Sequence, residues 1–305
     1  MEISLDVVKQ LNPTMARGLI PQWLSSFVES TPELTAEMVE NVTALMANAT
    51  DEDLAGALQH MVDIGSEYTL YPANPLARQV SRLYMGPLVE DSSLQGLENL
   101  KSAMKQGPCL LLSNHLSYCD TQLKDILLAR AGASDVAERI VAVAGPKVYG
   151  TVFRRMASSG LSTIQTAQSA TVAHNEAALT PREVGKIAIQ TIHRAAELMN
   201  SGSPVLIYAE GARSRDGRLQ PFLKAVRKYA KVPNLRVVPI GISGSNRMMP
   251  LHQTQMYATR IDLRIGEAVV VDPMERAEAI EETWRRIARM LPEENQPLPE
   301  TSPTA

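Results

Sequence analysis

The chain contains 305 residues, of which 45% are hydrophobic, 21% charged and 4% aromatic, and its formal net charge is −3. Its two cysteines, Cys109 and Cys119, are too few for a disulfide framework, and an acidic start argues against a signal peptide. Because no apolar run approaches the roughly 18 residues of a membrane helix, we expect a cytoplasmic protein, soluble or peripheral to a membrane, or a stromal one if the chain is a mature plastid fragment.

The first 72 residues are predicted to form a small helical bundle. Helix-start signals at 30–33 and 50–53 place a capping side chain three residues before an acid, and apolar residues then recur at helical spacing. Residues 1–70 hold eleven acids and two bases, a balance of −9, which leaves +6 for the remainder. A basic remainder favours a phosphorylated small molecule, an acidic carrier protein or an anionic membrane surface as partner. The scarcity of aromatic residues argues against nucleic acid.

Residues 73–292 are predicted to form an α/β domain. Helical signals at 76–86 and 94–106 come first, and short apolar runs bounded by Gly and Pro then alternate with helical stretches. The apolar runs span 108–113, 139–144, 160–166, 204–209 and 236–243, and the helical stretches span 121–131, 181–200 and 219–231. This alternation predicts a mostly parallel central sheet flanked by helices.

The C-terminal part of the chain is predicted to close this domain. We expect a later, antiparallel strand within 259–271 and a closing helix at 275–290. Residues 293–305, rich in Pro, Glu and Thr, are expected to be a flexible tail, and 167–179 a long loop.

The first candidate for chemistry is a histidine and an acid that directly follow the strand at 108–113. His115 should emerge at the carboxyl end of this strand, where ligands of α/β sheets bind, and Asp120 comes five residues later. If the connection turns into a helix, Asp120 can fold back and orient the imidazole as a general base. Taken alone the pair is a weak signal, because His115 could equally cap the helix and Asp120 be a solvated acid.

The second candidate is an arginine-rich loop after the strand at 204–209. Arg213 and Arg215 lie two residues apart beyond Gly211, a spacing that can direct both guanidinium groups at one anion. Glu210 is expected to hold the loop or to pair with an arginine. The alternative is a solvated basic loop.

Two further residues invite a functional interpretation. Lys147 follows the strand at 139–144 and could add a positive charge to an anion site. Cys119 lies four residues after His115, so a Cys–His nucleophile pair, as in a thioester hydrolase, is a less favoured alternative. The chain has no phosphate-binding loop, dinucleotide-binding glycine pattern, serine nucleophile elbow or HExxH metal motif.

Four of these segments, in order, resemble the glycerolipid acyltransferases, which include glycerol-3-phosphate and lysophosphatidate acyltransferases. The family motif N-H-x-x-x-x-D corresponds to Asn114, His115 and Asp120, and E-G-x-R-S corresponds to residues 210–214, from Glu210 to Ser214. An apolar strand ending in V-P-I corresponds to 238–240, and a looser match places Lys147 in the remaining motif. The resemblance covers about residues 108–243.

The resemblance implies a direct acyl transfer in phospholipid biosynthesis, without a metal or a bound cofactor. His115 and Asp120 would be catalytic, Arg213, Arg215 and Lys147 would bind the substrate phosphate, and Asn114, Glu210, Gly211 and Ser214 would support them. The acyl donor would be acyl-CoA or acyl-carrier protein. The run 213–219 and the acidic helical region are more similar to the glycerol-3-phosphate branch, so we expect transfer to the sn-1 hydroxyl of glycerol 3-phosphate. Lysophosphatidate is the alternative acceptor, and a non-catalytic lipid-binding module a more distant alternative.

Overall fold

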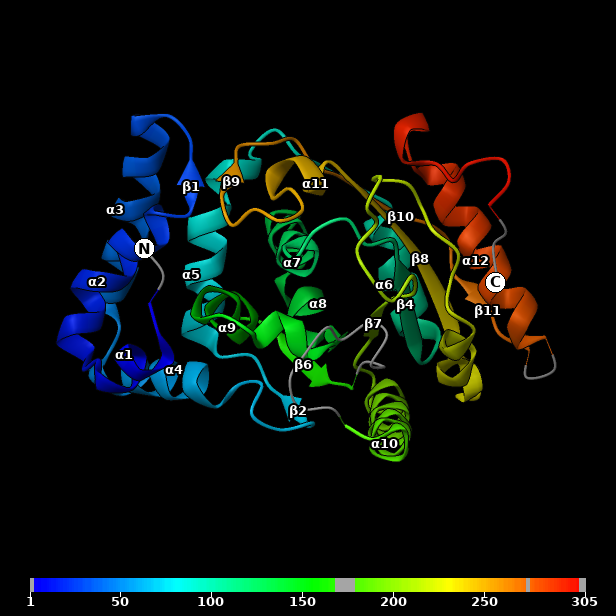
Figure 1. Cartoon of the computed structure of the whole chain (residues 1–305). Helices are drawn as coiled ribbons and strands as arrows, with labels where there is room; N and C mark the ends of the chain where they lie inside the picture. Colours follow the sequence, from blue (N-terminus) through cyan, green and yellow to red (C-terminus); the bar gives the residue numbers. More distant parts are fainter. Residues whose placement is uncertain (1–2, 168–178, 273–274, 302–305) are drawn as a thin grey trace.

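The structure of the protein is a computed structural model that describes residues 3–167, 179–272 and 275–301. Within this part a nine-stranded sheet runs through the centre of the molecule, in the order β2-β6-β5-β7-β4-β8-β10-β3, with β11 beside β8 (Figure 1). The strands are β2 (Leu70–Tyr71), β3 (Ser93–Gln95), β4 (Cys109–Ser113), β5 (Val141–Ala144), β6 (Ser162–Gln165), β7 (Val205–Tyr208), β8 (Arg236–Ser243), β10 (Asp262–Ile265) and β11 (Val269–Val270). The loop predicted at 167–179 lies outside the described residues except for its two ends.

The five central strands, β6, β5, β7, β4 and β8, are parallel, which confirms the predicted mostly parallel sheet. Antiparallel strands occur toward the edges: β2 pairs with β6, and β10 and β11 pair with β8. The single strand expected within 259–271 is therefore two short ones. β3 runs parallel to β10 at the edge of the sheet.

The apolar run of β4 is explained by its place in the middle of the sheet. All five residues are buried, because β7 and β8 pair with its two edges and hydrophobic clusters cover both of its faces. Leu110 and Leu112 contribute to one hydrophobic cluster, and Cys109 and Leu111 to the cluster on the opposite face.

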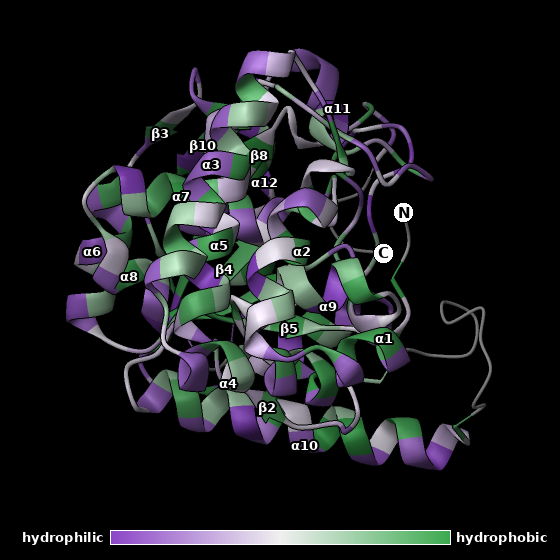
Figure 2. Cartoon of the chain, turned by 90° about the vertical axis from the view of Figure 1, so that its left-hand side faces the viewer, coloured by the Kyte–Doolittle hydropathy of each residue, from purple (hydrophilic) through white to green (hydrophobic). Residues whose placement is uncertain are grey.

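Helices cover both faces of the sheet. The cluster that contains Leu110 includes side chains of α10 (Pro181–Asn200), η3 (Lys224–Lys231) and α12 (Arg276–Met290). Figure 2 shows polar and apolar residues mixed along α10, which begins after the capping residue Thr180 and buries Ala195 and Met199. The opposite cluster includes side chains of α5 (Pro75–Met85), η1 (Pro87–Val89), α6 (Leu97–Gln106), α7 (Asp120–Arg130), α8 (Ser134–Arg139), α9 (Val152–Ser159) and α11 (Ser245–Met248).

The N-terminal residues form the predicted helices. These are α1 (Leu5–Gln10), α2 (Pro13–Ser25), α3 (Pro32–Asn48) and α4 (Asp51–Asp63), and Thr31 and Thr50 cap α3 and α4. Their buried side chains belong to the same cluster as Leu111, so they share a core with the sheet. Trp23 and Phe27 also pack against Phe153 of α9, and β1 (Val28–Glu29) pairs with β9 (Met256–Tyr257). The division of the chain at residue 72 stays a prediction.

Two expectations need correction. The helix predicted over 219–231 begins only at Lys224, because the preceding residues bond to other segments: the amide of Leu219 donates to Asn295 and that of Leu223 to Ala209. The predicted tail begins with a short helical turn, η4 (Glu293–Asn295), whose Asn295 is buried and donates to the carbonyl of Gly217. The described start of the tail is therefore held against the arginine loop.

No helix among the described residues is long and apolar enough to cross a bilayer.

Candidate functional site

Three neighbouring strands end at the candidate site. Ser113, the last residue of β4, is paired with Tyr208 of β7 on one side and with Ile240 of β8 on the other. The loops that leave β4 and β7 in the same direction carry His115 and Arg213, so residues far apart in sequence meet at the carboxyl end of the sheet.

His115 and Asp120 form the predicted pair. Their Nδ1 and Oδ2 atoms are 2.8 Å apart, and the same Oδ2 accepts the amides of Leu116 (2.8 Å) and Ser117 (3.1 Å). The carboxylate thereby closes the turn into α7, which is how a five-residue spacing brings the two side chains together. A neutral imidazole that donates from Nδ1 to this carboxylate presents the lone pair of Nε2 for accepting a proton.

Asp120 is fully buried yet favours its charged form. Burial works to raise the pKa of this carboxyl, but the hydrogen bond and charge of His115 outweigh it, with Lys124 assisting, and the pKa lies below its usual range. The side chain of His115 retains 17% exposure, whereas that of Asp120 has none. The imidazole of His115 is therefore accessible to a substrate, whereas the Asp120 carboxylate that bonds to it is not.

The loop of residues 210–214 holds both backbone polar groups of His115. Glu210 Oε1 accepts the amide of His115 at 2.7 Å, and the carbonyl of His115 accepts the amide of Ser214 at 2.8 Å. The other carboxylate oxygen of Glu210 accepts the amide of Gln220. Of the two predicted roles, Glu210 therefore holds the loop and pairs with no arginine among the described residues. Burial raises its pKa to about 8, although the two backbone hydrogen bonds act in the opposite direction.

The remaining supporting residues fix the backbone around the pair. The Asn114 side chain exchanges two hydrogen bonds of 2.9 Å with the backbone of Ile242, which ties the end of β4 to β8. Ser214 Oγ donates to the carbonyl of Arg218 or to Asp216 within its own loop. Gly211 has φ +75°, and a Cβ there would meet the Leu223 side chain, so glycine suits this turn.

Arg213 lies beside a second arginine that sequence reasoning did not select. The guanidinium carbons of Arg213 and Arg154 lie 3.6 and 4.1 Å from the centroid of the Tyr118 ring. Neither arginine forms an ion pair with an acid within the described residues. Burial and the charge of Arg154 both lower the pKa of Arg213, as expected for two cations held close together. Two arginines stacked on one ring form a candidate anion site.

The other two predicted cations lie near this arginine pair. The carbonyl of Lys147, in η2 (Pro146–Tyr149), accepts a hydrogen bond from Arg154, which places residue 147 next to the arginine pair. Arg215 is exposed on the same loop as Arg213. Arg155, adjacent to Arg154, instead binds carbonyls of Val62 and Tyr149 and has a structural role. The pair of adjacent arginines at 154–155 is the feature of the sequence that could have pointed to Arg154.

A partly buried tyrosine and a buried lysine lie behind the pair. The Tyr208 ring stacks on His115, with centroids 4.1 Å apart, and its hydroxyl is 2.8 Å from Thr121 Oγ1. Lys124 lies one helical turn after Asp120, with its ammonium 4.8 Å from the centroid of the Tyr208 ring. Neither residue was predicted to be a site residue. In the sequence, Lys124 resembles any other lysine of a predicted helix.

Cys119 lacks the environment of a nucleophile. Burial, with the charge of Asp120, raises the pKa of its thiol to about 12, although the hydrogen bond that it shares with the Ser117 hydroxyl acts in the opposite direction. The thiol therefore stays protonated at neutral pH, and the structure disfavours the thioester hydrolase alternative.

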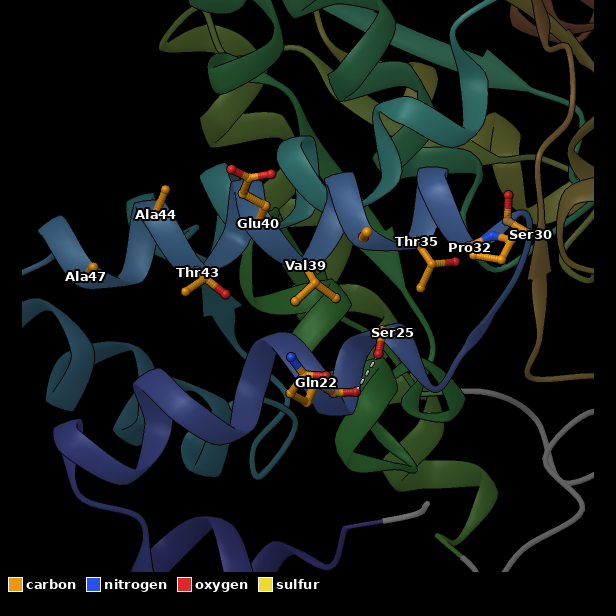
Figure 3. Close-up of a pocket in the computed structure, with 11 residues that line it drawn as sticks. Gln22, Ser25, Ser30, Pro32, Thr35, Val39, Glu40, Thr43, Ala44 and Ala47 are labelled. Atoms are coloured by element: carbon orange, nitrogen blue, oxygen red, sulfur yellow. Dashed lines mark hydrogen bonds between the residues drawn. The ribbon is translucent and has the colours of Figure 1, made fainter.

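An apolar cavity of about 40 Å³ adjoins the arginine pair, with room for only a few methylene groups. Its walls include Met85, Tyr118, Phe153, Arg154 and Met256, and Met85 and Phe153 also line a smaller cavity toward the N-terminal helices. A larger hollow of about 740 Å³ lies on the surface between α2 and α3 (Figure 3), but none of the site residues line it.

Comparison with known proteins points to one family. Residues 92–243 match the family model described as Acyltransferase, a span that includes the predicted 108–243. The chloroplastic 1-acyl-sn-glycerol-3-phosphate acyltransferase BAT2 of Brassica napus is 30% identical over 159 residues, which are 52% of this chain and 39% of that protein. The chloroplastic 1-acyl-sn-glycerol-3-phosphate acyltransferase LPAT1 of Arabidopsis thaliana is 28% identical over 158 residues, 52% of this chain and 37% of that protein.

The match therefore spans about two fifths of the length of these curated relatives. Among solved structures, a 1-acyl-sn-glycerophosphate acyltransferase of Thermotoga maritima has a TM-score of 0.44 and 16% identity, over 70% of this chain and 82% of that chain.

Proposed function

Because the chain belongs to the glycerolipid acyltransferase family, we propose that it transfers a fatty acyl group from an acyl thioester to the free hydroxyl of 1-acylglycerol 3-phosphate. The observation that carries this proposal is the meeting of the His115–Asp120 pair with a half-buried arginine pair. A general base and an anion site on one side of the sheet suit a hydroxyl substrate that is anchored by a phosphate.

The choice of acceptor departs from the expectation drawn from the sequence, which favoured glycerol 3-phosphate. Both curated relatives are named for 1-acylglycerol 3-phosphate, and this supports the alternative. The loop of residues 213–219 remains the feature that favours glycerol 3-phosphate, which is therefore the second acceptor to be tested.

In the proposed reaction His115 Nε2 removes the proton of the acceptor hydroxyl as its oxygen attacks the thioester carbonyl. The C–S bond then breaks, the new ester bond remains, and the imidazolium returns its proton to the departing thiolate. Asp120 holds the imidazole in the tautomer with Nδ1–H and stabilises the imidazolium. Nothing in this sequence of steps calls on Cys119.

The acceptor phosphate is proposed to bind Arg213 and Arg154, with Lys147 and Arg215 around the same anion. Tyr118 keeps the two guanidinium groups at fixed positions on its ring. Asn114, Glu210, Gly211 and Ser214 act indirectly, by fixing the backbone on either side of His115.

The decisive experiment is an activity matrix with the purified chain. Acyl-CoA and acyl-carrier protein serve as donors, and 1-acylglycerol 3-phosphate and glycerol 3-phosphate as acceptors. We expect higher kcat/KM with the acylated acceptor, and a loss of about 10²–10⁴-fold in kcat for His115→Ala. A preference for glycerol 3-phosphate would support the acceptor expected from the sequence. A fully active His115→Ala would refute the role of His115 as general base.

Two controls address the remaining alternatives. Cys119→Ala should retain most activity, whereas an inactive variant would support a thiol-dependent hydrolase. Failure of the wild-type chain to consume either donor with either acceptor would leave a non-catalytic lipid-binding module.

A further inference from the structure

The segment η3 presents a row of cations to the solvent. Lys224, Lys228 and Lys231 are exposed, and Arg227 is half-buried among them. None of the four forms an ion pair with another residue that the structure describes, whereas arginines of the neighbouring α12 pair with acids of their own helix. The charges of η3 are therefore available to a partner molecule.

The inner side of η3 fixes these cations in place. Val226 and Ala230 are buried in the cluster that also contains side chains of α10 and α12. At the rise of about 2 Å per residue in a 3₁₀-helix, the eight residues of η3 extend over about 15 Å. A single phosphate group is too small to engage the whole row. An extended acidic surface, such as one face of an acidic protein, matches its length and its charge.

η3 begins next to the loop that holds His115. The amide of Leu223 donates to the carbonyl of Ala209, directly after β7, and the Leu223 side chain lies against Gly211. This side chain is 51% exposed. An exposed apolar residue beside cations is typical of an interface with a protein, which combines an apolar centre with a polar rim. A protein bound there would therefore lie beside residues 210–214.

The distribution of charge over the chain favours the same surface. Residues 1–70 carry a balance of −9, whereas the segment 213–231 holds seven bases and one acid. Figure 1 shows the N-terminal helices at one end of the molecule and α10 and α12, which pack with η3, toward the other. An acidic protein is repelled by the first end and attracted to the second.

We propose that the η3 surface, formed by Leu223, Lys224, Arg227, Lys228 and Lys231, is the docking site of acyl-carrier protein, the acidic one of the two donors considered above. This inference rests on the proposed function, because it names the donor of the same reaction. Docking at η3 places the carrier beside the site, so that the thioester on its prosthetic arm can reach His115. Acyl-CoA has no protein surface to dock, so its use does not depend on η3.

The test compares the two donors, carrying the same acyl group, with the acceptor that the activity matrix identifies. Lys224→Glu/Lys228→Glu reverses two exposed charges outside the proposed catalytic and phosphate sites. We expect KM for acyl-carrier protein to rise about 10- to 100-fold, because attraction at two positions becomes repulsion. The values of kcat and of KM for acyl-CoA should stay unchanged.

The matched control is Lys101→Glu/Lys105→Glu. These two lysines have the same spacing on α6, whose buried side chains belong to the cluster on the opposite face of the sheet. The control variant should keep the wild-type KM for both donors. An equal rise in KM for acyl-carrier protein in both variants would show that net charge alone matters, and would overturn the proposal.

Ionic strength provides a measurement on the wild-type chain. Salt screens contacts between surface charges, so KM for acyl-carrier protein should rise about 10-fold between about 0.05 and 0.3 M NaCl. KM for acyl-CoA should change much less, and Lys224→Glu/Lys228→Glu should weaken the dependence. A KM for acyl-carrier protein that is independent of salt, or a wild-type chain that accepts acyl-CoA alone, overturns the proposal.

Binding without turnover separates this inference from the proposed function. Labelled acyl-carrier protein is titrated with His115→Ala, without acceptor, and followed by fluorescence anisotropy. Weaker binding after addition of Lys224→Glu/Lys228→Glu supports the docking site even if the wild-type chain transfers no acyl group. Transfer from acyl-carrier protein with an unchanged KM in the charge-reversed variant would leave the function standing and refute the docking site.

Vesicles of phosphatidylglycerol test the other anionic partner. The proposal predicts that Lys224→Glu/Lys228→Glu changes binding to the carrier more than sedimentation with these vesicles. Loss of sedimentation with unchanged affinity for the carrier would assign the η3 surface to a membrane and overturn the proposal.

Discussion

The carboxylate of Glu210 accepts the backbone amide of His115 across 95 positions of sequence, at 2.7 Å. Because Ser214 bonds to the carbonyl of the same histidine, the loop that carries Arg213 also determines where the imidazole lies. The positions of His115 and of the anion site therefore depend on the same loop, residues 210–214. A change in this loop should affect catalysis as well as binding.

Glu210→Gln tests this connection. Above pH 8 the wild-type side chain is a carboxylate that accepts two backbone amides, whereas glutamine presents one donor group to them. We expect kcat to fall by about 10- to 100-fold there, the effect of a charge-assisted hydrogen bond. Below pH 8 the protonated acid resembles the amide, so the difference should shrink. Measuring kcat from pH 6 to 9.5 checks this, with the exposed Glu294→Gln as control.

Arg154→Ala and Arg213→Ala should chiefly raise KM for the phosphorylated acceptor. Losing a bidentate phosphate contact costs about 1.5–3 kcal/mol, or roughly 10- to 100-fold in KM. Because both guanidinium groups stack on Tyr118, the effects of the two substitutions on KM should not be additive in the double variant. Arg194→Ala, an exposed arginine paired with Glu197, provides the matched control. An unchanged KM in Arg154→Ala would remove that residue from the site.

Asp125→Asn should destabilise the protein. This buried carboxylate bonds to Arg82 and lies 3.6 Å from Arg78, which joins α7 to α5. Removing its charge leaves the buried Arg78 without an acidic partner and Arg82 with only the exposed Glu138, at a cost of about 3–5 kcal/mol in the free energy of unfolding. Urea denaturation measures the change. Glu138→Gln, which affects an exposed partner of Arg82, should cost less than about 1 kcal/mol.

Lys124 should also leave a signature in stability. Its pKa is about 8 when folded and near 10.5 when unfolded, so between these values the unfolded chain binds more protons. The stabilising contribution is complete above pH 10.5 and is lost as pH falls through 8. Relative to Lys124→Met, the wild type should gain roughly 3 kcal/mol between pH 7.5 and 10.5. Urea denaturation of both proteins at both pH values tests this. The same change in the free energy of unfolding in wild type and Lys124→Met would contradict a buried lysine.

The sequence predicted the strands and the main helices because their signals are local. The apolar runs at 108–113 and 236–243 became β4 and β8, and the helical stretch at 181–200 became α10. The helix at 219–231 was overestimated because its first residues form hydrogen bonds with distant partners. Asn295 and Ala209 supply them, and no local pattern reveals such contacts.

The sequence by itself determined which residues could do chemistry: the spacing of His115 and Asp120, and the arginine loop that follows a strand. Tertiary structure decided how they work together. It brought Arg154 from α9 against Arg213, assigned Glu210 to the backbone of His115, and buried Lys124 behind the pair. These relationships join residues up to 95 positions apart, and they depend on which strands are neighbours in the sheet. Strand order is a property of packing, so only the folded chain could show them.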